Sequence, residues 1–221
     1  NDLTITSQKM EHHKVSISDV IDRAVKESDY EKKYKSYSEN KNGRYIKGIG
    51  LSCSMRGVSL GAEGTDTVAG IVSIQSDGSV YILCGLTENG MGLKTVLSQT
   101  VAEIFGIDIT DITYLDQDTS LIADSGPTVA SRSTLVGGNV MKIASEEIKS
   151  RLLDLATTVL KDKRENIIFN DNLVLAKNNN KITFKELIQL AFKEGINTSA
   201  YGWYKAPQVS WDEEIGQGNA Y

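Results

Sequence analysis

A β-hairpin signal in the middle of the chain is the feature that most constrains the fold. Residues 68–75 and 80–84 are rich in β-branched and other apolar side chains, which favour extended backbone. The Ser76-Asp77-Gly78 segment between them contains the Asp-Gly pair that is typical of a tight hairpin turn. The sequence therefore predicts two neighbouring antiparallel strands, around which the other elements must be arranged.

Two amphipathic helices are predicted after this hairpin. In residues 93–105 the apolar side chains fall on one helical face, and Gly106 provides a stop signal. A longer helix is predicted from Ser131 to about Lys161. Its expected buried stripe consists of Val136, Val140, Ile143, Ile148, Leu152, Leu155 and Val159.

The other predicted elements are shorter. They are a surface helix around residues 17–25, strands at 46–55 and 109–115, a hairpin at 166–177, a helix at 183–194 and an aromatic segment at 199–204. Thr183 and Glu186 have the spacing of a capping box at the start of their helix.

The order of these elements predicts the fold class. Strands and helices alternate without the regular spacing of a parallel doubly wound fold, so we expect an α+β protein with mixed β-sheets and helices packed on their faces. The amino-acid composition changes near Tyr45, from a polar and Lys/Glu-rich stretch to one rich in residues that favour β-strands. We therefore expect an N-terminal helical segment at residues 1–44 and a main domain at residues 45–221.

The composition excludes several classes of protein. With 221 residues, 40% hydrophobic and 24% charged, the chain has the make-up of a globular protein. No run approaches about eighteen consecutive apolar residues, so no membrane span is predicted. A net charge of −5 disfavours a broad nucleic-acid-binding surface. We expect partners other than membranes and nucleic acids.

Cysteine and histidine are scarce in the sequence. Cys53 and Cys84 are too few for a disulfide framework or a four-thiolate iron–sulfur site, and they favour a reducing cytoplasm. The two histidines, His12 and His13, are adjacent in a polar stretch, which favours a surface pair over a metal site. We assign no metal ligand and no catalytic residue to this chain, so redox chemistry must come from a bound cofactor or another chain.

The first segment with chemical potential is residues 85–95, where a strand leads into a helix through several glycines. Glycines let backbone N–H groups approach a ligand, and a helix N-terminus offers unpaired donors to a phosphate. The alternative is a glycine loop that only makes a tight turn. The spacing matches neither the dinucleotide-binding glycine pattern nor the Walker A loop.

The second segment is residues 118–134, which also lead from a loop into a helix. Small and hydroxyl-bearing side chains crowd this helix start, where backbone donors lack partners. Local capping by Ser131 or Ser133 is the alternative. Two such helix starts in one domain suggest donor clusters that converge on one anionic ligand.

At these two segments the sequence resembles the molybdenum hydroxylases, the xanthine dehydrogenase and aldehyde oxidase family. The family runs Asp-Gly-Ser-Val and Gly-x-x-Glu-x-Gly-Gln-Gly-Leu-x-Thr match residues 77–80 and 85–95. A second run, Ser-x-Pro-Thr-Ala-Ala-Ser-x-Ser, matches residues 125–133. The resemblance covers roughly residues 45–221 and implies part of the molybdopterin-binding large subunit, with the fold of that domain.

The resemblance also implies a set of site residues. The cofactor-binding positions that it carries over are Gly90, Met91, Gly92, Ala130, Ser131 and Ser133. It places Val129 on the substrate side, near molybdenum. Met91 stands where the family has glutamine, which exchanges an amide for a thioether, and Val129 stands where the family has alanine, which narrows the pocket.

The implied activity is that of an oxidoreductase which hydroxylates purines, N-heterocycles or aldehydes. In the complete enzyme molybdopterin would carry the molybdenum, and iron–sulfur clusters and FAD would lie on other domains or subunits. The family's Gly-x-Gly-Glu base motif does not occur in this sequence. We therefore expect a domain fragment that is inactive by itself and does not retain molybdopterin alone. Its expected partners are the rest of the molybdopterin subunit and the iron–sulfur and flavin domains or subunits.

Two other functions remain open from the sequence. One is a cofactor-free association domain or subunit of the same fold, which Met91 and the absent motifs favour. The other is an unrelated phosphate-binding enzyme that uses residues 90–92. It lacks a clear acid–base set, because its acidic loop residues read equally well as solvated charges: Glu88, Asp116, Asp118 and Asp124.

Overall fold

The computed structural model describes residues 16–40, 42–54 and 66–207, together with Glu214 and the backbone of four two-residue strands. These strands are β1 (Thr4–Ile5), β2 (Gln8–Lys9), β10 (Trp211–Asp212) and β11 (Gln217–Gly218). The chain divides into two compact units: Asn1–Arg56 with Ser210–Asn219, and Gly57–Val209 with Ala220–Tyr221. His12 and His13 lie outside the described residues.

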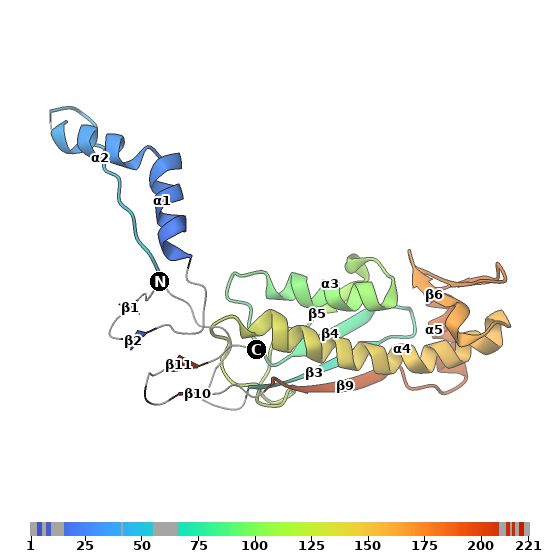
Figure 1. Ribbon diagram of the computed structural model, residues 1–221. Coiled ribbons are helices and arrows are strands. Elements are labelled where there is room, and N and C mark those ends of the chain that lie inside the picture. Colours follow the sequence, from blue (N-terminus) through green and yellow to red (C-terminus); the bar gives the residue numbers. More distant parts are fainter. Residues whose placement is uncertain are drawn as a thin grey trace. The chain divides into compact units, whose positions relative to one another are not determined.

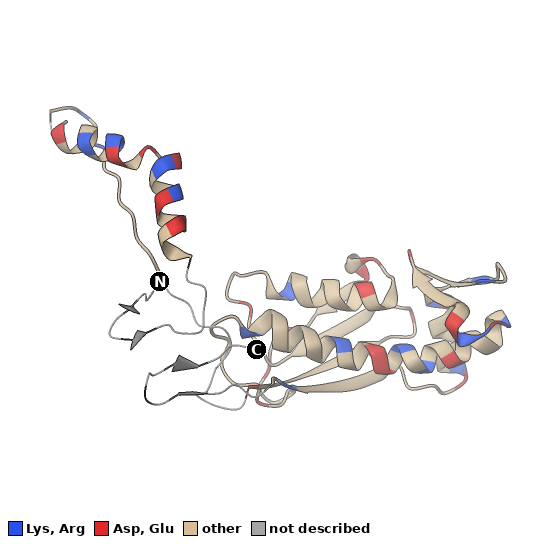
Figure 2. Ribbon diagram, viewed as in Figure 1, with Lys and Arg blue, Asp and Glu red and all other residues tan. Residues whose placement is uncertain are grey.

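The first unit contains the predicted N-terminal helix and a second one, α1 (Ile17–Glu27) and α2 (Tyr30–Glu39) (Figure 1). Neither helix has a fully buried residue, and Figure 2 shows acidic and basic residues distributed along both. The strand predicted from residue 46 is wrong for residues 46–54, which are neither helix nor strand. Gly48 and Gly50 weaken extended pairing there, and Ile46 is 71% exposed.

The second unit is built on a four-stranded mixed sheet in the order β5-β4-β3-β9. Its strands are β3 (Thr67–Ile74), β4 (Val80–Cys84), β5 (Ile112–Tyr114) and β9 (Ser199–Lys205). The predicted β3–β4 hairpin is confirmed, and β9 pairs antiparallel with the other side of β3. The parallel β4–β5 pair is joined through α3 (Leu93–Phe105), whose bounds agree with the prediction.

Two helices cover one face of this sheet, α3 and α4 (Gly138–Leu160) (Figure 1). Along β3, alternate residues Val68, Val72 and Ile74 are buried in the core that these helices close. The α+β class with mixed sheets and helices packed on a face is therefore confirmed. No helix among the described residues is long and apolar enough to span a bilayer.

The predicted long helix differs from α4 at its start and on its buried face. A π-helical turn, Ser133–Gly137, precedes α4. Ile143 was expected in the buried stripe but is 39% exposed, whereas Ala144 and Ser145 are fully buried. Helix and sheet approach closely here, so small side chains fill the interface and the larger isoleucine faces outwards.

A smaller three-stranded sheet lies beyond the far end of α4. Its strands are β6 (Ile167–Asn170), β7 (Leu173–Ala176) and β8 (Lys181–Thr183), followed by α5 (Phe184–Lys193). The predicted hairpin and the Thr183–Glu186 capping box are confirmed, whereas β8 was not predicted. The strand expected at 109–115 is shorter, because a 3-10 turn at Ile109–Asp111 precedes β5.

The closeness of α4 to the sheet makes Gly202 on β9 a sensitive position. A Cβ atom there would lie 2.3 Å from the Val140 carbonyl oxygen, which is backbone and cannot rotate away. We predict that Gly202→Ala lowers the free energy of unfolding by about 1–3 kcal/mol through overpacking. Gly138→Ala is the matched control, because an added Cβ there meets nothing within 4 Å. Denaturant unfolding that ranks the two variants equally would contradict this packing.

Candidate functional site

Two loops that precede the helices lie side by side at one end of the main sheet. The glycine loop (residues 85–92) connects β4 to α3, and the serine loop (residues 123–132) leads into the π-helical turn before α4. The Thr87 N–H group donates a hydrogen bond to Thr128 Oγ1 at 2.7 Å, which joins the loops directly. The structure therefore brings together the two segments that were singled out in the sequence.

The glycine loop is organised around the side chain of Glu88. Its Oε1 atom accepts hydrogen bonds from the N–H groups of Gly90 (2.6 Å) and Gly92 (3.1 Å), and Oε2 accepts one from Lys94 (3.1 Å). Both glycines have positive φ angles, of 97° and 83°, which allow the backbone to turn around the carboxylate. The expectation that this helix start leaves its donors unpaired is wrong for these three groups.

These hydrogen bonds also fix the charge state of Glu88. The Lys94 N–H group, with those of Gly92 and Gly90, holds the pKa of this carboxyl group below its usual range. Because the folded pKa lies below the unfolded one, the stabilisation is present above the unfolded pKa and is lost as the pH falls through the folded pKa. Glu88 is therefore an ionised helix cap at neutral pH, not a general acid.

The outer side of the glycine loop is an open backbone surface. A Cβ atom added to Gly90 or to Gly92 would meet nothing within 4 Å. The Met91 side chain is 51% exposed. Its Sδ atom accepts a hydrogen bond from the Asn89 N–H group at 3.3 Å. This loop therefore presents an open surface that a ligand could contact, rather than a cluster of free hydrogen-bond donors.

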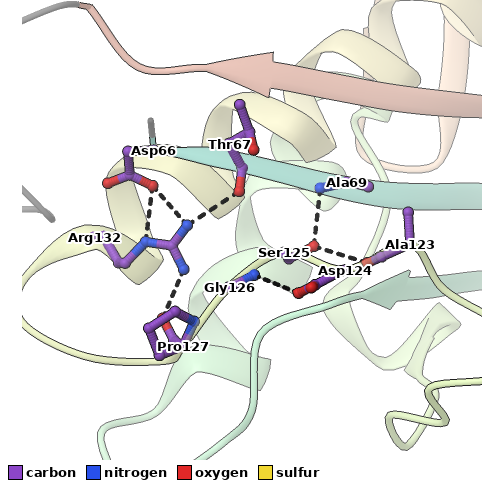
Figure 3. Close-up of polar contacts among 9 residues, drawn as sticks. All are labelled: Asp66, Thr67, Ala69, Ala123, Asp124, Ser125, Gly126, Pro127 and Arg132. Carbon is purple, nitrogen blue, oxygen red and sulfur yellow. Dashed lines mark hydrogen bonds and ion pairs between the residues drawn. The ribbon is translucent and has the colours of Figure 1, made fainter. Parts of the chain in front are cut away.

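A fully buried arginine anchors the serine loop to the start of β3. Arg132 Nε donates to Asp66 Oδ1 at 2.8 Å, and Nη2 lies 2.6 Å from the same oxygen (Figure 3). Nη1 donates to the Pro127 carbonyl group at 2.7 Å, and Nη2 donates to that of Thr67 at 3.1 Å. One guanidinium group thus ties β3 to both the middle and the end of the loop.

A second attachment holds the beginning of the serine loop on the same strand. The hydroxyl group of Ser125 accepts a hydrogen bond from the Ala69 N–H group and donates one to the Ala123 carbonyl group, each at 3.1 Å (Figure 3). Gly85 packs against this serine, because a Cβ atom there would lie 2.2 Å from Ser125 Oγ. The two loops are therefore fixed to one another and to β3.

The exposed part of the serine loop carries free hydrogen-bond donors. Val129 is 45% exposed, Ser131 is exposed, and Ala130 has a positive φ angle of 51°. The N–H groups of these three residues and the Ser131 hydroxyl group have no acceptor among the described protein groups. Ser133, in contrast, is buried at 8% exposure, so it lies beneath the loop rather than on its surface.

The remaining acidic and thiol groups near the loops have structural partners or are inert. Asp116 forms an ion pair with Lys94 at 2.6 Å, and Asp118 accepts two hydrogen bonds from Ser120. These contacts lower the pKa of each carboxyl group, while burial raises the pKa of Cys84 to about 11. Among the described residues, no three His, Cys, Asp or Glu side chains gather in a group suited to a metal ion.

Three residues of this site were missed in the sequence analysis. Glu88 was weighed as a solvated charge, although an acidic residue just before a helix start is a capping signal. Arg132 was recognised only as part of a run, and Asp66 was not singled out. Their pairing joins positions 66 residues apart, for which the sequence carries no local signal.

Comparison with known proteins identifies relatives of the chain. Residues 23–221 match the model of a family described as a molybdopterin cofactor-binding domain. Xanthine dehydrogenase of Dictyostelium discoideum is 27% identical over 207 residues, which cover 91% of this chain and 14% of that protein. Xanthine dehydrogenase/oxidase of Gallus gallus is 26% identical over 222 residues, which cover 100% of this chain and 15% of that protein. The chain thus spans a small part of the length of these relatives.

Solved structures show the same fold. Quinoline 2-oxidoreductase from Pseudomonas putida 86 has a TM-score of 0.59 at 20% identity, covering 70% of this chain and 22% of its own. Aldehyde oxidoreductase from Desulfovibrio gigas has a TM-score of 0.59 at 19% identity, covering 96% of this chain and 20% of its own. The resemblance inferred from the two sequence runs is confirmed, as is the fold that it implied.

The buried arginine of the serine loop yields a stability prediction. Arg132→Lys keeps the charge, but a single ammonium group cannot reach Asp66, Thr67 and Pro127 together. We predict a loss of about 3 kcal/mol in the free energy of unfolding, because buried acceptor groups would lose their hydrogen-bond donors. Arg23→Lys in the exposed pair with Glu27 is the control and should cost less than about 1 kcal/mol. Urea unfolding measures both, and equal stability of wild type and Arg132→Lys would exclude the anchoring role.

Proposed function

Because the chain belongs to the molybdopterin cofactor-binding domain family, we propose that its two loops form one wall of a pterin site in a molybdenum hydroxylase. The single observation that carries this proposal is the Thr87–Thr128 hydrogen bond, which places an open glycine surface beside a set of free N–H donors. The substrate class that we propose is a purine, an N-heterocycle or an aldehyde.

The residues of this wall suit a flat heterocycle that carries a polar or anionic group. Gly90 and Gly92 have no side chain that would keep a ring at a distance, and the serine loop supplies unpaired N–H groups. We assign cofactor contacts to Gly90, Met91, Gly92, Ala130 and Ser131, a supporting position behind them to Ser133, and the substrate side to Val129. When bound, the cofactor would supply the molybdenum chemistry, while these residues bind and orient it.

Ser133 needs separate mention among these assignments because it is buried. Its contribution would be to support Ala130 and Ser131 from below rather than to meet a ligand directly.

Met91 supports a second candidate, a cofactor-free association domain, because its thioether turns back onto the Asn89 N–H group. Measurement of bound molybdenum decides between the two.

The remaining parts of the enzyme would lie outside this chain. The two xanthine dehydrogenases named above are about seven times longer than this chain, so we propose that the chain is a fragment of a longer molybdopterin subunit. In this fragment residues 1–44 form an N-terminal helical segment and residues 45–221 form part of the molybdopterin-binding domain. The glutamate base, the iron–sulfur clusters and FAD would belong to its other parts or to partner subunits. A cytoplasmic setting fits the free thiols of Cys53 and Cys84.

The proposal predicts the effect of a bulky side chain on the serine loop. Ser131→Phe in the full-length protein should lower the molybdenum content about ten-fold or more, which corresponds to about 1.4 kcal/mol of binding free energy. Thr158→Phe, an exposed hydroxyl-to-ring change near the other end of α4, is the control and should retain the metal. Metal analysis of the purified variants is the measurement, with unfolding temperatures to confirm the fold. Full molybdenum content in Ser131→Phe would contradict the assignment.

A further prediction concerns the 221-residue chain alone. One wall of a site leaves a bound cofactor exposed to water, so the isolated chain should not retain molybdopterin after purification. Metal analysis and cofactor fluorescence after acid release would test this. Stoichiometric molybdenum in the isolated chain would show that two loops are sufficient.

A further inference from the structure

In the glycine loop the carboxylate of Glu88 occupies the position at the backbone N–H groups where an anion-binding loop would bind its ligand. We propose that Glu88 is a positioning residue whose carboxylate is a built-in anion, holding the glycine loop in the shape that receives the pterin. As a consequence, anionic groups of a ligand do not dock on this loop, which contacts an uncharged face instead. The inference rests on the proposed function and adds to it a role for Glu88 and the orientation of the ligand, with its uncharged face towards the glycine loop.

A count of the loop's N–H groups supports this role. Those of Gly90, Gly92 and Lys94 all point at Glu88, at 2.6, 3.1 and 3.1 Å. The Asn89 N–H group is taken by Met91 Sδ. Four of the N–H groups that would otherwise attract a phosphate at this helix start are therefore already satisfied from inside the protein.

The same hydrogen bonds determine which side of the loop faces outwards. With their N–H groups turned towards the carboxylate, Gly90 and Gly92 present a surface on which an added Cβ would meet nothing within 4 Å. Lys94 does not neutralise Glu88 with its ammonium group, because that group is 2.6 Å from Asp116. The charge of Glu88 is thus balanced by backbone dipoles, and it repels a second anion at this position.

An ordinary helix cap is the competing explanation, and the chain contains a comparator for it. At α5, Glu186 accepts hydrogen bonds from Thr183 in a capping box, and its pKa is also lowered. It belongs to the smaller sheet and its helix, with no loop of the site beside it. If Glu88 only capped α3, removing either carboxylate would affect stability alone.

The experiment compares wild type, Glu88→Gln and Glu186→Gln in the full-length protein. Unfolding temperature, molybdenum content and amide hydrogen exchange are measured for each. We expect both variants to unfold at lower temperature, but only Glu88→Gln to lose molybdenum, by about five-fold or more, since charge-assisted hydrogen bonds are lost beneath the cofactor. Exchange at Gly90, Gly92 and Lys94 should accelerate in that variant alone. If Glu88→Gln does not fold, Glu88→Asp, which keeps the charge but shortens the side chain, carries the same comparison.

A titration of wild type with inorganic phosphate tests the ligand orientation. The amide signals of Gly90, Gly92 and Lys94 should not shift, and saturable shifts there would overturn the inference. Equal molybdenum content in Glu88→Gln and Glu186→Gln would also overturn it, while leaving the proposed function intact. A wild-type protein that contains no molybdenum would instead overturn the proposed function, and with it the cofactor part of this inference.

Discussion

The buried ion pair between Arg132 and Asp66 is the interaction on which the site depends. A guanidinium group with no solvent exposure must have its donors satisfied, and here Asp66, Thr67 and Pro127 accept its hydrogen bonds. Removing either partner would leave a buried charge uncompensated, so the pair fixes the position of the loop even though its desolvation cost offsets much of its Coulombic gain. It places the serine loop on the strand whose neighbour leads into the glycine loop.

The two loops differ in how their backbone donors are satisfied. In the glycine loop an ionised carboxylate satisfies the backbone donors, whereas in the serine loop the exposed N–H groups have no acceptor among the described protein groups. A ligand with one anionic and one uncharged part would therefore bind in a single direction along the wall. This asymmetry arises from Glu88, a residue type that composition alone would count as one more surface charge.

Local rules account for much of the fold, and long-range contacts account for what they missed. The β3–β4 hairpin, α3 and the α5 capping box follow from short signals, namely Asp77-Gly78, Gly106 and the Thr183–Glu186 spacing. Ile143 was predicted to be buried because the helical spacing of apolar residues carries no information on the close approach of helix and sheet at Gly202. The strand predicted from residue 46 failed because residues 46–54 lack a partner strand in the described structure. The two loops were found from their sequence runs, but the capping by Glu88 and the Arg132–Asp66 pair required coordinates.

The attachment of the serine loop to β3 bears on how portable this site is. Thr67 and Ala69, which bind Arg132 and Ser125, are two positions apart on one strand, and Gly70 of the same strand pairs with Cys84 just before the glycine loop. Both anchors are backbone groups, and successive residues of a strand direct these groups to opposite edges of the strand. Inserting one residue between these anchors and Gly70 would therefore turn them to the other edge of β3, although both loop sequences would be intact. The smallest unit for grafting onto another scaffold is therefore three segments long: the two loops and the strand that sets the spacing between them.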